Sequence, residues 1–344
     1  MKRPASAEHM RAEVERHAAV HAAVHAGLLC CWQTCCAHQR GGRQAMTILG
    51  IHHVTLVCAS AQRTLLFYTW VLGMRLVKQT VSVDAPGTYQ LYFGDAQATP
   101  GRMIAFLEWP KVPCGTRGIG GIRRLGLATP AGALDALEQR LRSFGVPSER
   151  RGQALDLRDP DGVELTIYAE GGEAPPGSPP PIWLGQITAM CSSLGATARF
   201  MGEVLGVPPS AAAHAGSQSF LGGGSGPQLA YLEDRQCATP RAQVGGGQSH
   251  HLSLAVPDEV ALIEWRERLI RAGLHASPII DRFYFKSLYT HDPDGLVIEL
   301  ATSAPGLAVD EPPEQLGHAL MLPPWLEPQR AMIERVLPPL KPVC

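Results

Sequence analysis

The sequence predicts an α+β fold in which four β-α-β-β-β modules form two domains with curled sheets. Short β-rich runs recur along the chain, and the turn Asp-Pro-Asp-Gly occurs twice, at 159–162 and 292–295. Each copy follows a helical segment that ends in glycine, at Gly145 and Gly273. The 36 Gly and 29 Pro residues fit many short strands joined by tight turns.

Length and charge narrow the class of protein. With 344 residues, the chain is long enough for about two domains and a sizeable core. Its 30 basic and 31 acidic residues nearly balance, so charge gives no reason to expect a nucleic acid or a membrane as partner. Most of the nine Cys residues are scattered singly, which favours reduced thiols and a cytoplasmic location.

Residues 1–46 do not follow the module pattern. The segment is rich in Ala, His and Arg and has no apolar run long enough to span a membrane. We expect a disordered or partly helical extension, with a basic targeting segment as the rival interpretation, and the ordered pattern begins after Met46. The pairs Cys30-Cys31 and Cys35-Cys36 lie near histidines, but no further group completes a familiar zinc-site spacing.

The first predicted domain, 47–172, begins with a module that sets the pattern for the others. A strand is expected at 51–57, a helix leads to 67–73, and further strands follow near 89–93 and 103–107. Alternation of apolar and polar residues predicts that each strand has one buried face.

The second module repeats this order with a different opening strand. It starts at 122–128, continues through a helix over 133–144, and ends in a strand at 163–168 after the first Asp-Pro-Asp-Gly turn. The segment 171–181 is rich in Gly and Pro and is the expected domain boundary.

The second predicted domain, 182–303, contains the third and fourth modules. The stretch 200–206 parallels 67–73 in the first module, so a block of two modules has been duplicated. The tail, 304–344, is rich in Pro, and we expect it to pack on the modules with a short helix at 329–336.

Paired histidines open two of the four modules, His52-His53 in the first and His250-His251 in the last. Because neighbouring side chains of a strand point to opposite faces, only one imidazole of each pair can enter a given site. The corresponding pairs in the second and third modules are Arg123-Arg124 and Gly185-Gln186.

A single carboxylate, Glu299, lies in the apolar strand that ends the fourth module. If the first and last modules share a cavity, one His from each and Glu299 converge as two imidazoles and one carboxylate. This set is typical of non-haem Fe(II) sites that activate dioxygen. A lone His on a strand is more often structural, but recurrence at equivalent places favours ligands. Glu164 stands nearer its turn than Glu299, so we expect it elsewhere on its strand or facing solvent.

The chain resembles the vicinal oxygen chelate superfamily of glyoxalases, bleomycin-resistance proteins and extradiol dioxygenases. Within it, the likeness is to ring-cleaving dioxygenases of the hydroquinone type, such as methylhydroquinone-degrading and chlorohydroquinone 1,2-dioxygenases. The resemblance covers 47–340. The stretches that carry it are 50–56, 89–95, 281–285 and 322–327.

The resemblance implies a metal centre and its ligands. In the family, the second His of each pair and the last-strand Glu bind iron, which corresponds to His53, His251 and Glu299. The implied cofactor is Fe(II), and Mn(II) would suit the same donors. The implied partners are a small aromatic diol and O2, with a homo-oligomer left open.

The resemblance also implies catalytic roles for His52, Arg282 and Tyr289, and a weaker one for His250. A guanidinium near the substrate favours a deprotonated phenolate oxygen. A phenol or imidazole within hydrogen-bond reach can pass a proton. Expected cavity walls are Phe283, Tyr284, Phe285 and Trp325.

The predicted function is an Fe(II)-dependent extradiol-type dioxygenase that cleaves a hydroquinone or catechol ring and inserts both atoms of O2. A glyoxalase-like lyase or isomerase is the first alternative, but it would want a further acidic ligand, and the equivalent strand of the first module offers only Glu108. A non-catalytic binding protein of the same fold is the second, and it would not need the three ligands. The sequence does not select one diol.

Overall fold

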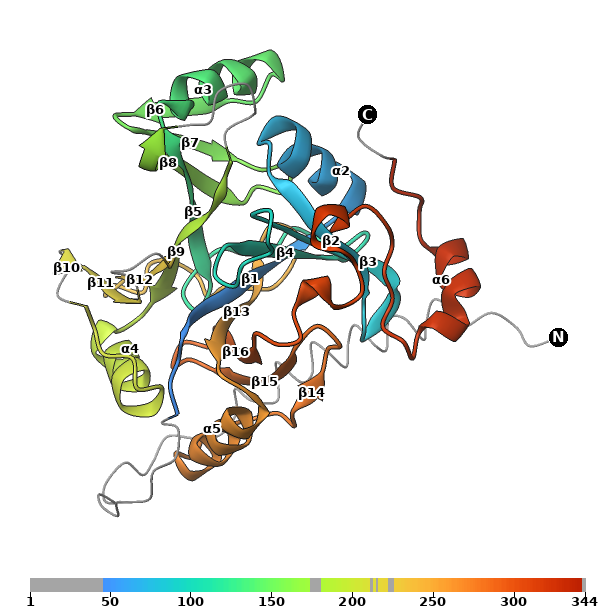
Figure 1. Ribbon diagram of the computed structural model, residues 1–344. Helices are drawn as coiled ribbons and strands as arrows, with labels where there is room; N and C mark the ends of the chain where they lie inside the picture. Colours follow the sequence, from blue (N-terminus) through green and yellow to red (C-terminus); the bar gives the residue numbers. More distant parts are fainter. Residues whose placement is uncertain (1–45, 174–180, 211–212, 215, 222–225, 342–344) are drawn as a thin grey trace. The chain divides into compact units, whose positions relative to one another are not determined.

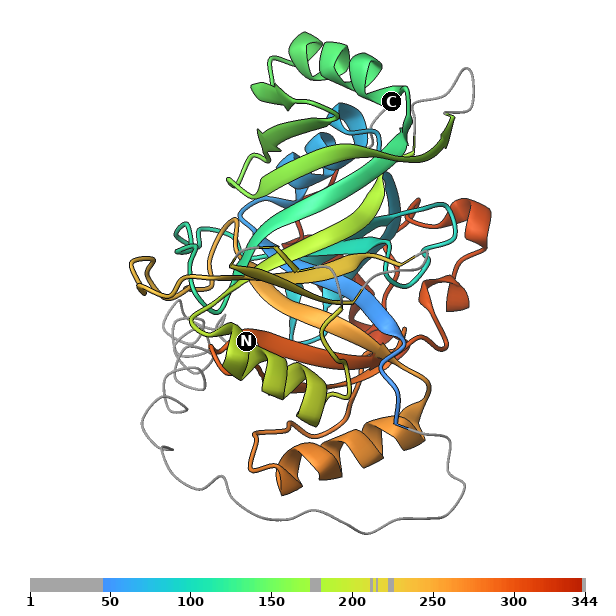
Figure 2. The same cartoon turned by 90° about the vertical axis from the view of Figure 1, so that its left-hand side faces the viewer.

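The computed structural model describes residues 46–173, 181–210, 213–214, 216–221 and 226–341. Residues 1–45 of the predicted extension 1–46, with its Cys and His cluster, lie outside this description, as does most of the predicted linker. In the described residues, strands outnumber helices and form two curled eight-stranded sheets (Figures 1 and 2). The predicted α+β fold is therefore confirmed.

Sheet 1 combines the first and fourth modules. Its strand order is β14-β15-β16-β13-β1-β4-β3-β2, and the central pair β1 and β13 is antiparallel. The opening strands of the first and last modules therefore lie side by side, as the predicted site requires. The strands are β1 (Gly50–Cys58), β2 (Arg75–Ser82), β3 (Ala85–Gly94), β4 (Met103–Glu108), β13 (Ser249–Val256), β14 (Ile280–Asp281), β15 (Lys286–His291) and β16 (Val297–Thr302).

Sheet 2 combines the second and third modules with the same topology. Its order is β10-β11-β12-β9-β5-β8-β7-β6, with β5 and β9 as the antiparallel central pair. The strands are β5 (Ile122–Ala131), β6 (Ser148–Arg151), β7 (Ala154–Arg158), β8 (Glu164–Glu173), β9 (Trp183–Cys191), β10 (Ala213–His214), β11 (Ser217–Leu221) and β12 (Gln228–Glu233).

The helices follow the predicted repeat. Ser60 and Ser193 cap equivalent helices, because each side chain accepts a hydrogen bond from the backbone N–H three residues later. Each of these helices continues into a π-helical turn at the repeated sequence motif. The elements are α2 (Ala61–Leu66), η2 (Phe67–Val71), α3 (Ala133–Ser143), α4 (Leu194–Arg199), η3 (Phe200–Val204), α5 (Glu259–Arg271) and α6 (Arg330–Val336), with short 3-10 turns η4 (Leu307–Val309), η5 (Pro313–Gln315) and η6 (Glu327–Gln329). The helices expected at 133–144 and 329–336 are present to within a residue.

The two Asp-Pro-Asp-Gly turns have the same structure and join the sheets. The Oδ1 atom of Asp292 accepts hydrogen bonds from the backbone N–H groups of Asp294 and Leu296, and Asp159 makes the equivalent bonds. Tyr231 of β12 donates its hydroxyl to Asp292 at 3.2 Å, and Tyr68 of η2 donates to Asp159 at 3.2 Å. Each turn therefore links a module of one sheet to a module of the other.

The two faces of sheet 1 meet different surroundings. On β1, Val54 and Leu56 pack into the main apolar core with Leu65 of α2, whereas His53 lies on the opposite face. Helices α2 and α5 pack outside the curl of this sheet (Figure 1). The inner face carries the imidazoles and a smaller apolar cluster, on which the C-terminal part of the chain packs through Leu307 and Leu316.

A strap formed by 304–321 covers the inner face of sheet 1. Asp310 accepts a hydrogen bond from Tyr284 at 2.9 Å and an ion pair from Lys78 at 2.6 Å, and Glu311 also pairs with Lys78. The Lys78 side chain is fully buried, and a buried ammonium needs such partners. Because Lys78 lies on edge strand β2 and Tyr284 lies between β14 and β15, the strap joins the two edges of the sheet.

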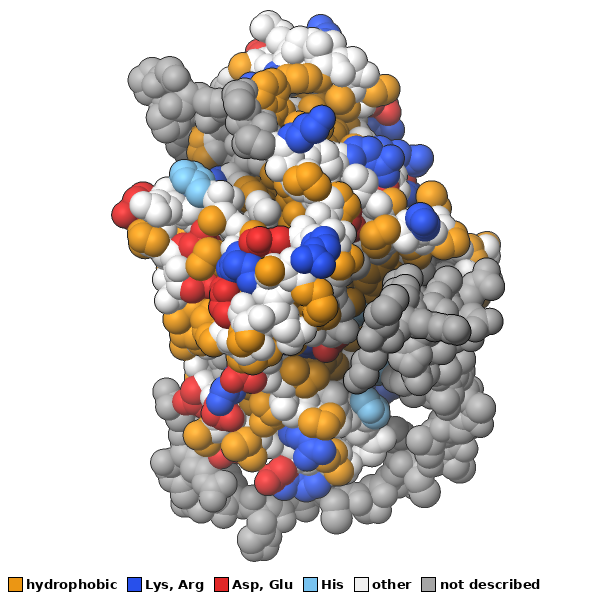
Figure 3. Space-filling view, turned by 90° about the vertical axis from the view of Figure 1, so that its right-hand side faces the viewer, with side chains coloured by type: hydrophobic (Ala, Val, Ile, Leu, Met, Phe, Trp, Pro, Cys, Tyr) orange, Lys and Arg blue, Asp and Glu red, His pale blue; other side chains and the backbone are white. Residues whose placement is uncertain are grey.

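One face of the described surface shows no dominant charge. On the face drawn in Figure 3, the coloured basic and acidic side chains are interspersed and form no large field of one sign. Across the segments that the structure describes, no helix has the length and apolar character needed to cross a bilayer.

Candidate metal centre

Three predicted residues meet on the inner face of sheet 1. His53, His251 and Glu299 come from the adjacent strands β1, β13 and β16. The two imidazole Nε2 atoms lie 3.3 Å apart, and Glu299 Oε2 lies 3.6 Å from His53 Nε2 and 3.5 Å from His251 Nε2. His53 and Glu299 are 1% exposed and His251 is 5% exposed. Among the described residues, this is the one group of His, Cys, Asp and Glu side chains close enough to share an ion.

The spacing of these atoms fits a divalent metal. Two ligand atoms that are each about 2.1 Å from one ion lie about 3.0 Å apart at a right angle and about 3.4 Å apart at a tetrahedral angle. Glu299 Oε2 is buried and has no hydrogen-bond partner, which is costly for a carboxylate oxygen. A bound cation would satisfy this oxygen, and two imidazoles with one carboxylate leave further coordination positions open.

Burial sets the protonation of the three side chains. It lowers the pKa of His53 and His251 below the ordinary value, so both rings are neutral and each offers a lone pair. Burial also opposes ionisation of Glu299, but the hydrogen bond that the Tyr289 hydroxyl donates to it favours the carboxylate and holds its pKa below the usual range. The group is therefore a neutral–neutral–anionic donor set.

The histidine preceding each of these imidazoles fixes the ring. His52 and His53 approach through their Nδ1 atoms at 2.8 Å, and His250 and His251 do the same at 2.8 Å. In both pairs, the Nε2 atom of the second ring is therefore the one that could bind a metal. A hydrogen bond to the far nitrogen orients a metal-binding imidazole and selects its tautomer.

Tyr289 and Arg282 extend the site outward from Glu299. The Tyr289 hydroxyl donates to Glu299 Oε1 at 2.5 Å, which leaves Oε2 for the metal. Arg282 Nη2 donates to the Tyr289 oxygen at 3.3 Å, and Arg282 Nη1 donates to Asp84 Oδ2 at 2.7 Å. Burial and Glu299 raise the pKa of Tyr289, so the phenol keeps its proton. Burial opposes the charge of Arg282, but the carboxylates of Asp84 and Glu299 raise its pKa, so it stays cationic.

Aromatic rings and unpaired hydroxyls surround the two imidazoles. The ring centroids of Tyr92 and Phe285 lie 5.9 and 5.6 Å from that of His53. The hydroxyls of Thr55 and Ser253 are buried without a hydrogen-bond partner. Both strand positions pair with a candidate ligand, Thr55 with His251 and Ser253 with His53. The site therefore offers an apolar wall with polar groups available to a ligand.

The four aromatic residues expected as cavity walls take different positions. Phe285 lies against both His52 and His53, with ring centroids 5.1 and 5.6 Å apart. Tyr284 is buried and binds the strap. Phe283 packs on Trp325, whose side chain is 45% exposed. Phe285 is thus the member of this group that touches the imidazoles.

For Glu164 the sequence predicted either a different strand position from that of Glu299 or exposure to solvent. The first prediction is confirmed. The other expectation, that it faces solvent, is wrong, because Glu164 is 7% exposed. It accepts hydrogen bonds from Arg123 at 2.6 Å, from Arg158 at 3.0 Å and from Arg117. An acid buried at this depth needs cationic partners, and the arginines supply them.

Glu108, the acid considered for a glyoxalase-like site, is used elsewhere. Its carboxylate accepts hydrogen bonds from the backbone N–H groups of Ala61 at 2.8 Å and of Tyr89 at 3.4 Å. It therefore caps the start of α2. On β4 it pairs with Cys58, at the far end of β1 from His53.

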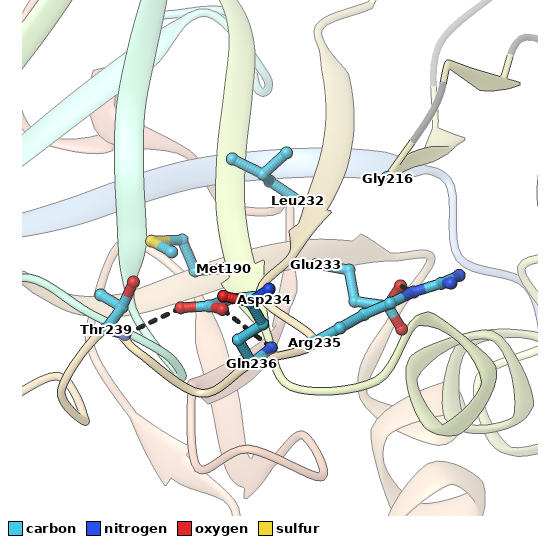
Figure 4. A pocket seen from close by; sticks show the side chains of 8 residues that line it. All are labelled: Met190, Gly216, Leu232, Glu233, Asp234, Arg235, Gln236 and Thr239. Carbon is cyan, nitrogen blue, oxygen red and sulfur yellow. Dashed lines mark hydrogen bonds and ion pairs between the residues drawn. The ribbon is translucent and has the colours of Figure 1, made fainter.

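A separate pocket of about 450 Å³ lies at the end of β12 in sheet 2 (Figure 4). Its acidic groups are already paired, since Asp234 accepts hydrogen bonds from the backbone N–H groups of Thr239 at 2.8 Å and Gln236 at 3.2 Å. Glu233 is bound by Arg235 at 2.5 Å. The pocket therefore lacks buried polar groups without hydrogen-bond partners, such as those near the imidazoles of sheet 1.

Sequence reasoning missed Thr55, Ser253, Tyr92 and Asp84. Alternation would have found Thr55 and Ser253, which lie two residues after His53 and His251 on the same strand face. Asp84 comes from the opposite edge of the sheet, and no local pattern predicts its contact with Arg282.

This duplicated fold and its paired-histidine centre define the class of protein. The chain belongs to the Glyoxalase/Bleomycin resistance protein/Dioxygenase superfamily, whose model matches residues 50–167 and 183–300.

Similar proteins agree with this assignment. The chain is 34% identical to "Putative ring-cleaving dioxygenase MhqO" of Bacillus subtilis, over 86% of this chain and 98% of the relative. It is 28% identical to "Chlorohydroquinone/hydroquinone 1,2-dioxygenase" of Sphingobium indicum, over 81% of this chain and 92% of the relative. A crystal structure of a "putative dioxygenase" from Bacillus subtilis superposes with a TM-score of 0.77 at 31% identity, covering 86% of this chain and 99% of the other.

Proposed function

We propose that the protein is an Fe(II)-dependent ring-cleaving dioxygenase of the extradiol type that acts on a hydroquinone or catechol. One observation carries the proposal. The side chains of His53, His251 and Glu299 lie close together and buried, and one carboxylate oxygen of Glu299 has no hydrogen-bond partner. The names of the relatives support a ring-cleaving reaction. Ferrous iron held by these residues would supply dioxygen binding and the electron transfer that the reaction needs.

The surrounding residues would prepare the substrate. Arg282 is cationic and partly buried, so it would stabilise a phenolate oxygen placed near Tyr289. Tyr289 keeps its proton and donates it to Glu299, and turning this O–H away from Glu299 would let it donate to an oxygen that gains negative charge. Phe285 and Tyr92 would confine the ring and exclude water.

His52 would act by holding His53 rather than by titrating. Burial and the adjacent ring of His53 lower the pKa of His52 to about 3, so His52 is neutral near neutral pH. Its Nδ1 contact fixes the orientation of His53. We infer the same role for His250 toward His251.

The glyoxalase-like alternative receives less support. Its further acidic ligand would have to be Glu108, which caps α2. A binding protein without metal would leave Glu299 Oε2 buried and unpaired.

Oxygen uptake tests the proposal. The protein is loaded with Fe(II) without air and then mixed with aerated hydroquinones and catechols. We expect one O2 consumed per ring cleaved and both atoms of ¹⁸O2 in the product. Isomerisation of a hemithioacetal without O2 uptake would identify the glyoxalase-like alternative. Binding of a ring with neither reaction would identify a binding protein, and each of these results would contradict the proposal.

A further inference from the structure

The metal centre connects to the surface through a chain of four side chains. Glu299 is 1% exposed and binds partly buried Tyr289, which binds Arg282. The Arg282 side chain is 16% exposed and binds Asp84, whose side chain is 54% exposed. Exposure rises toward the outer end of this chain of side chains, so Asp84 and Arg282 connect the buried candidate ligands to the surface.

The pair of Asp84 and Arg282 closes the sheet across its two edges. Asp84 lies in the turn between β2 and β3, at one edge of sheet 1. Arg282 lies between β14 and β15, at the other edge. The loop that carries Arg282 is tightly held, since the Arg282 N–H donates to the Phe285 carbonyl at 2.9 Å and Phe283 adopts a left-handed φ of 70°. The guanidinium is therefore presented to Asp84 by a fixed backbone.

This ion pair contributes little to folding. A carboxylate that is half exposed keeps most of its hydration, and exposed ion pairs add little to stability. The effect of the pair is local, because Asp84 partly offsets the positive charge of Arg282 and accepts a hydrogen bond from Nη1, while Nη2 remains directed at Tyr289.

We propose that Asp84 is a positioning and specificity-determining residue at the entrance to the metal centre, where it holds Arg282 in place and selects uncharged aromatic diols over diols that carry a carboxylate. This inference rests on the proposed function, because it names the substrates that the same site accepts. A carboxylate on the ring would be repelled by Asp84 and would have to compete with it for the positive charge of Arg282. A ring with phenolic groups alone meets neither obstacle.

The Asp84→Asn variant of the full, Fe(II)-loaded chain tests the proposal. Asparagine keeps the shape and can still accept from Arg282, but it removes the negative charge. We compare hydroquinone with 2,5-dihydroxybenzoate by oxygen uptake, and we measure binding of both rings without air by calorimetry. We expect the preference for hydroquinone, as a ratio of kcat/KM, to fall about tenfold, mainly through KM. The calorimetric affinity ratio should fall with it.

Glu259→Gln is the matched control. Glu259 is a half-exposed carboxylate paired with Lys286 at 2.6 Å, and the structure gives it no contact with Arg282. Glu259→Gln should change neither the kcat/KM ratio nor the affinity ratio of the two rings. Both variants should keep the thermal unfolding midpoint of the parent protein. An unchanged affinity ratio in Asp84→Asn, an equal change in Glu259→Gln, or failure of the parent protein to bind either ring would overturn the inference.

The two measurements separate this inference from the proposed function. If the parent protein binds hydroquinone but consumes no O2, the dioxygenase proposal fails. The calorimetric comparison of the two rings would still decide the role of Asp84.

Discussion

The two sheets share one topology, but their equivalent positions hold opposite kinds of side chain. Strand register places Gln186, Arg124 and Thr166 of sheet 2 where sheet 1 has His53, His251 and Glu299, respectively. Sheet 1 thus carries imidazoles and a carboxylate at positions where sheet 2 carries an amide, a guanidinium and a hydroxyl.

The side chains of sheet 2 satisfy one another. Arg124 donates to Asp156 at 3.0 Å and to Thr166 at 2.9 Å, and Gln186 donates to Gln228 at 3.0 Å. In sheet 1, by contrast, Glu299 Oε2 and the nearby hydroxyls of Thr55 and Ser253 are buried without hydrogen-bond partners. The duplicated backbone provides an equivalent place for a site in each sheet. The sheet that would bind a ligand is distinguished by buried polar groups without hydrogen-bond partners, and not by the fold.

The largest expected effect comes from removing the carboxylate. Glu299→Gln should abolish iron binding and reduce oxygen uptake by at least about 100-fold. Removing only a residue that hydrogen-bonds to a metal ligand costs up to about 100-fold, and removing the ligand itself should cost at least as much. Thr166→Val, at the equivalent position of sheet 2, should keep iron and activity. Metal analysis and oxygen uptake check both variants, and full iron content in Glu299→Gln would contradict the ligand assignment.

The next effect concerns the turns that join the sheets. Burial raises the pKa of Asp292 to about 7, well above the ordinary range of an aspartate. Because the folded state favours the protonated carboxyl, this group's contribution to stability is present below pH 4 and is lost as pH rises through 7. The free energy of unfolding should therefore fall by about 2 kcal/mol between pH 5 and pH 7 through this group alone.

Chemical denaturation at several pH values measures this dependence. Asp292→Asn should flatten the curve near pH 7. Asp159→Asn should flatten it near pH 6, because burial raises the pKa of Asp159 to about 6. Identical pH profiles in the parent protein and Asp292→Asn would show that Asp292 is ionised throughout.

A smaller effect is expected at the hydroxyl that holds Glu299. Tyr289→Phe should lower kcat/KM about tenfold, the lower end of the effects of such outer partners. The phenylalanine ring keeps the packing but leaves Glu299 Oε1 without its donor. Asp156→Asn, at the equivalent position of sheet 2, should leave kinetics unchanged. Steady-state kinetics compares the two, and a normal kcat/KM in Tyr289→Phe would remove this residue from the reaction.

The smallest effect is expected in sheet 2 itself. The Arg124 side chain is 36% exposed, and ion pairs at such positions contribute about 0–1 kcal/mol. Arg124→Met should therefore lower the free energy of unfolding by no more than about 1 kcal/mol and should leave iron content unchanged. A loss of iron in this variant would show that the two sheets depend on each other.

Local sequence patterns predicted the modules because repeats and turns are local signals. The paired histidines, the glycine-ended helices and both Asp-Pro-Asp-Gly turns could be read directly, and the candidate ligands followed from one assumption about which modules meet. The contacts of Asp84 with Arg282 and of Lys78 with Asp310 join residues about 200 or more positions apart. Such contacts depend on how far a sheet curls, and no periodicity in the chain encodes that distance.

Strand order also sets when each sheet can be completed during synthesis. Sheet 2 is built from neighbouring modules and can close soon after β12 leaves the ribosome. Strand β1 must wait for β13, which follows it by roughly 190 residues, or about 10–40 s of translation. The first histidine pair therefore spends this time without its partner strand, and the ion-binding cavity can assemble only on a nearly finished polypeptide.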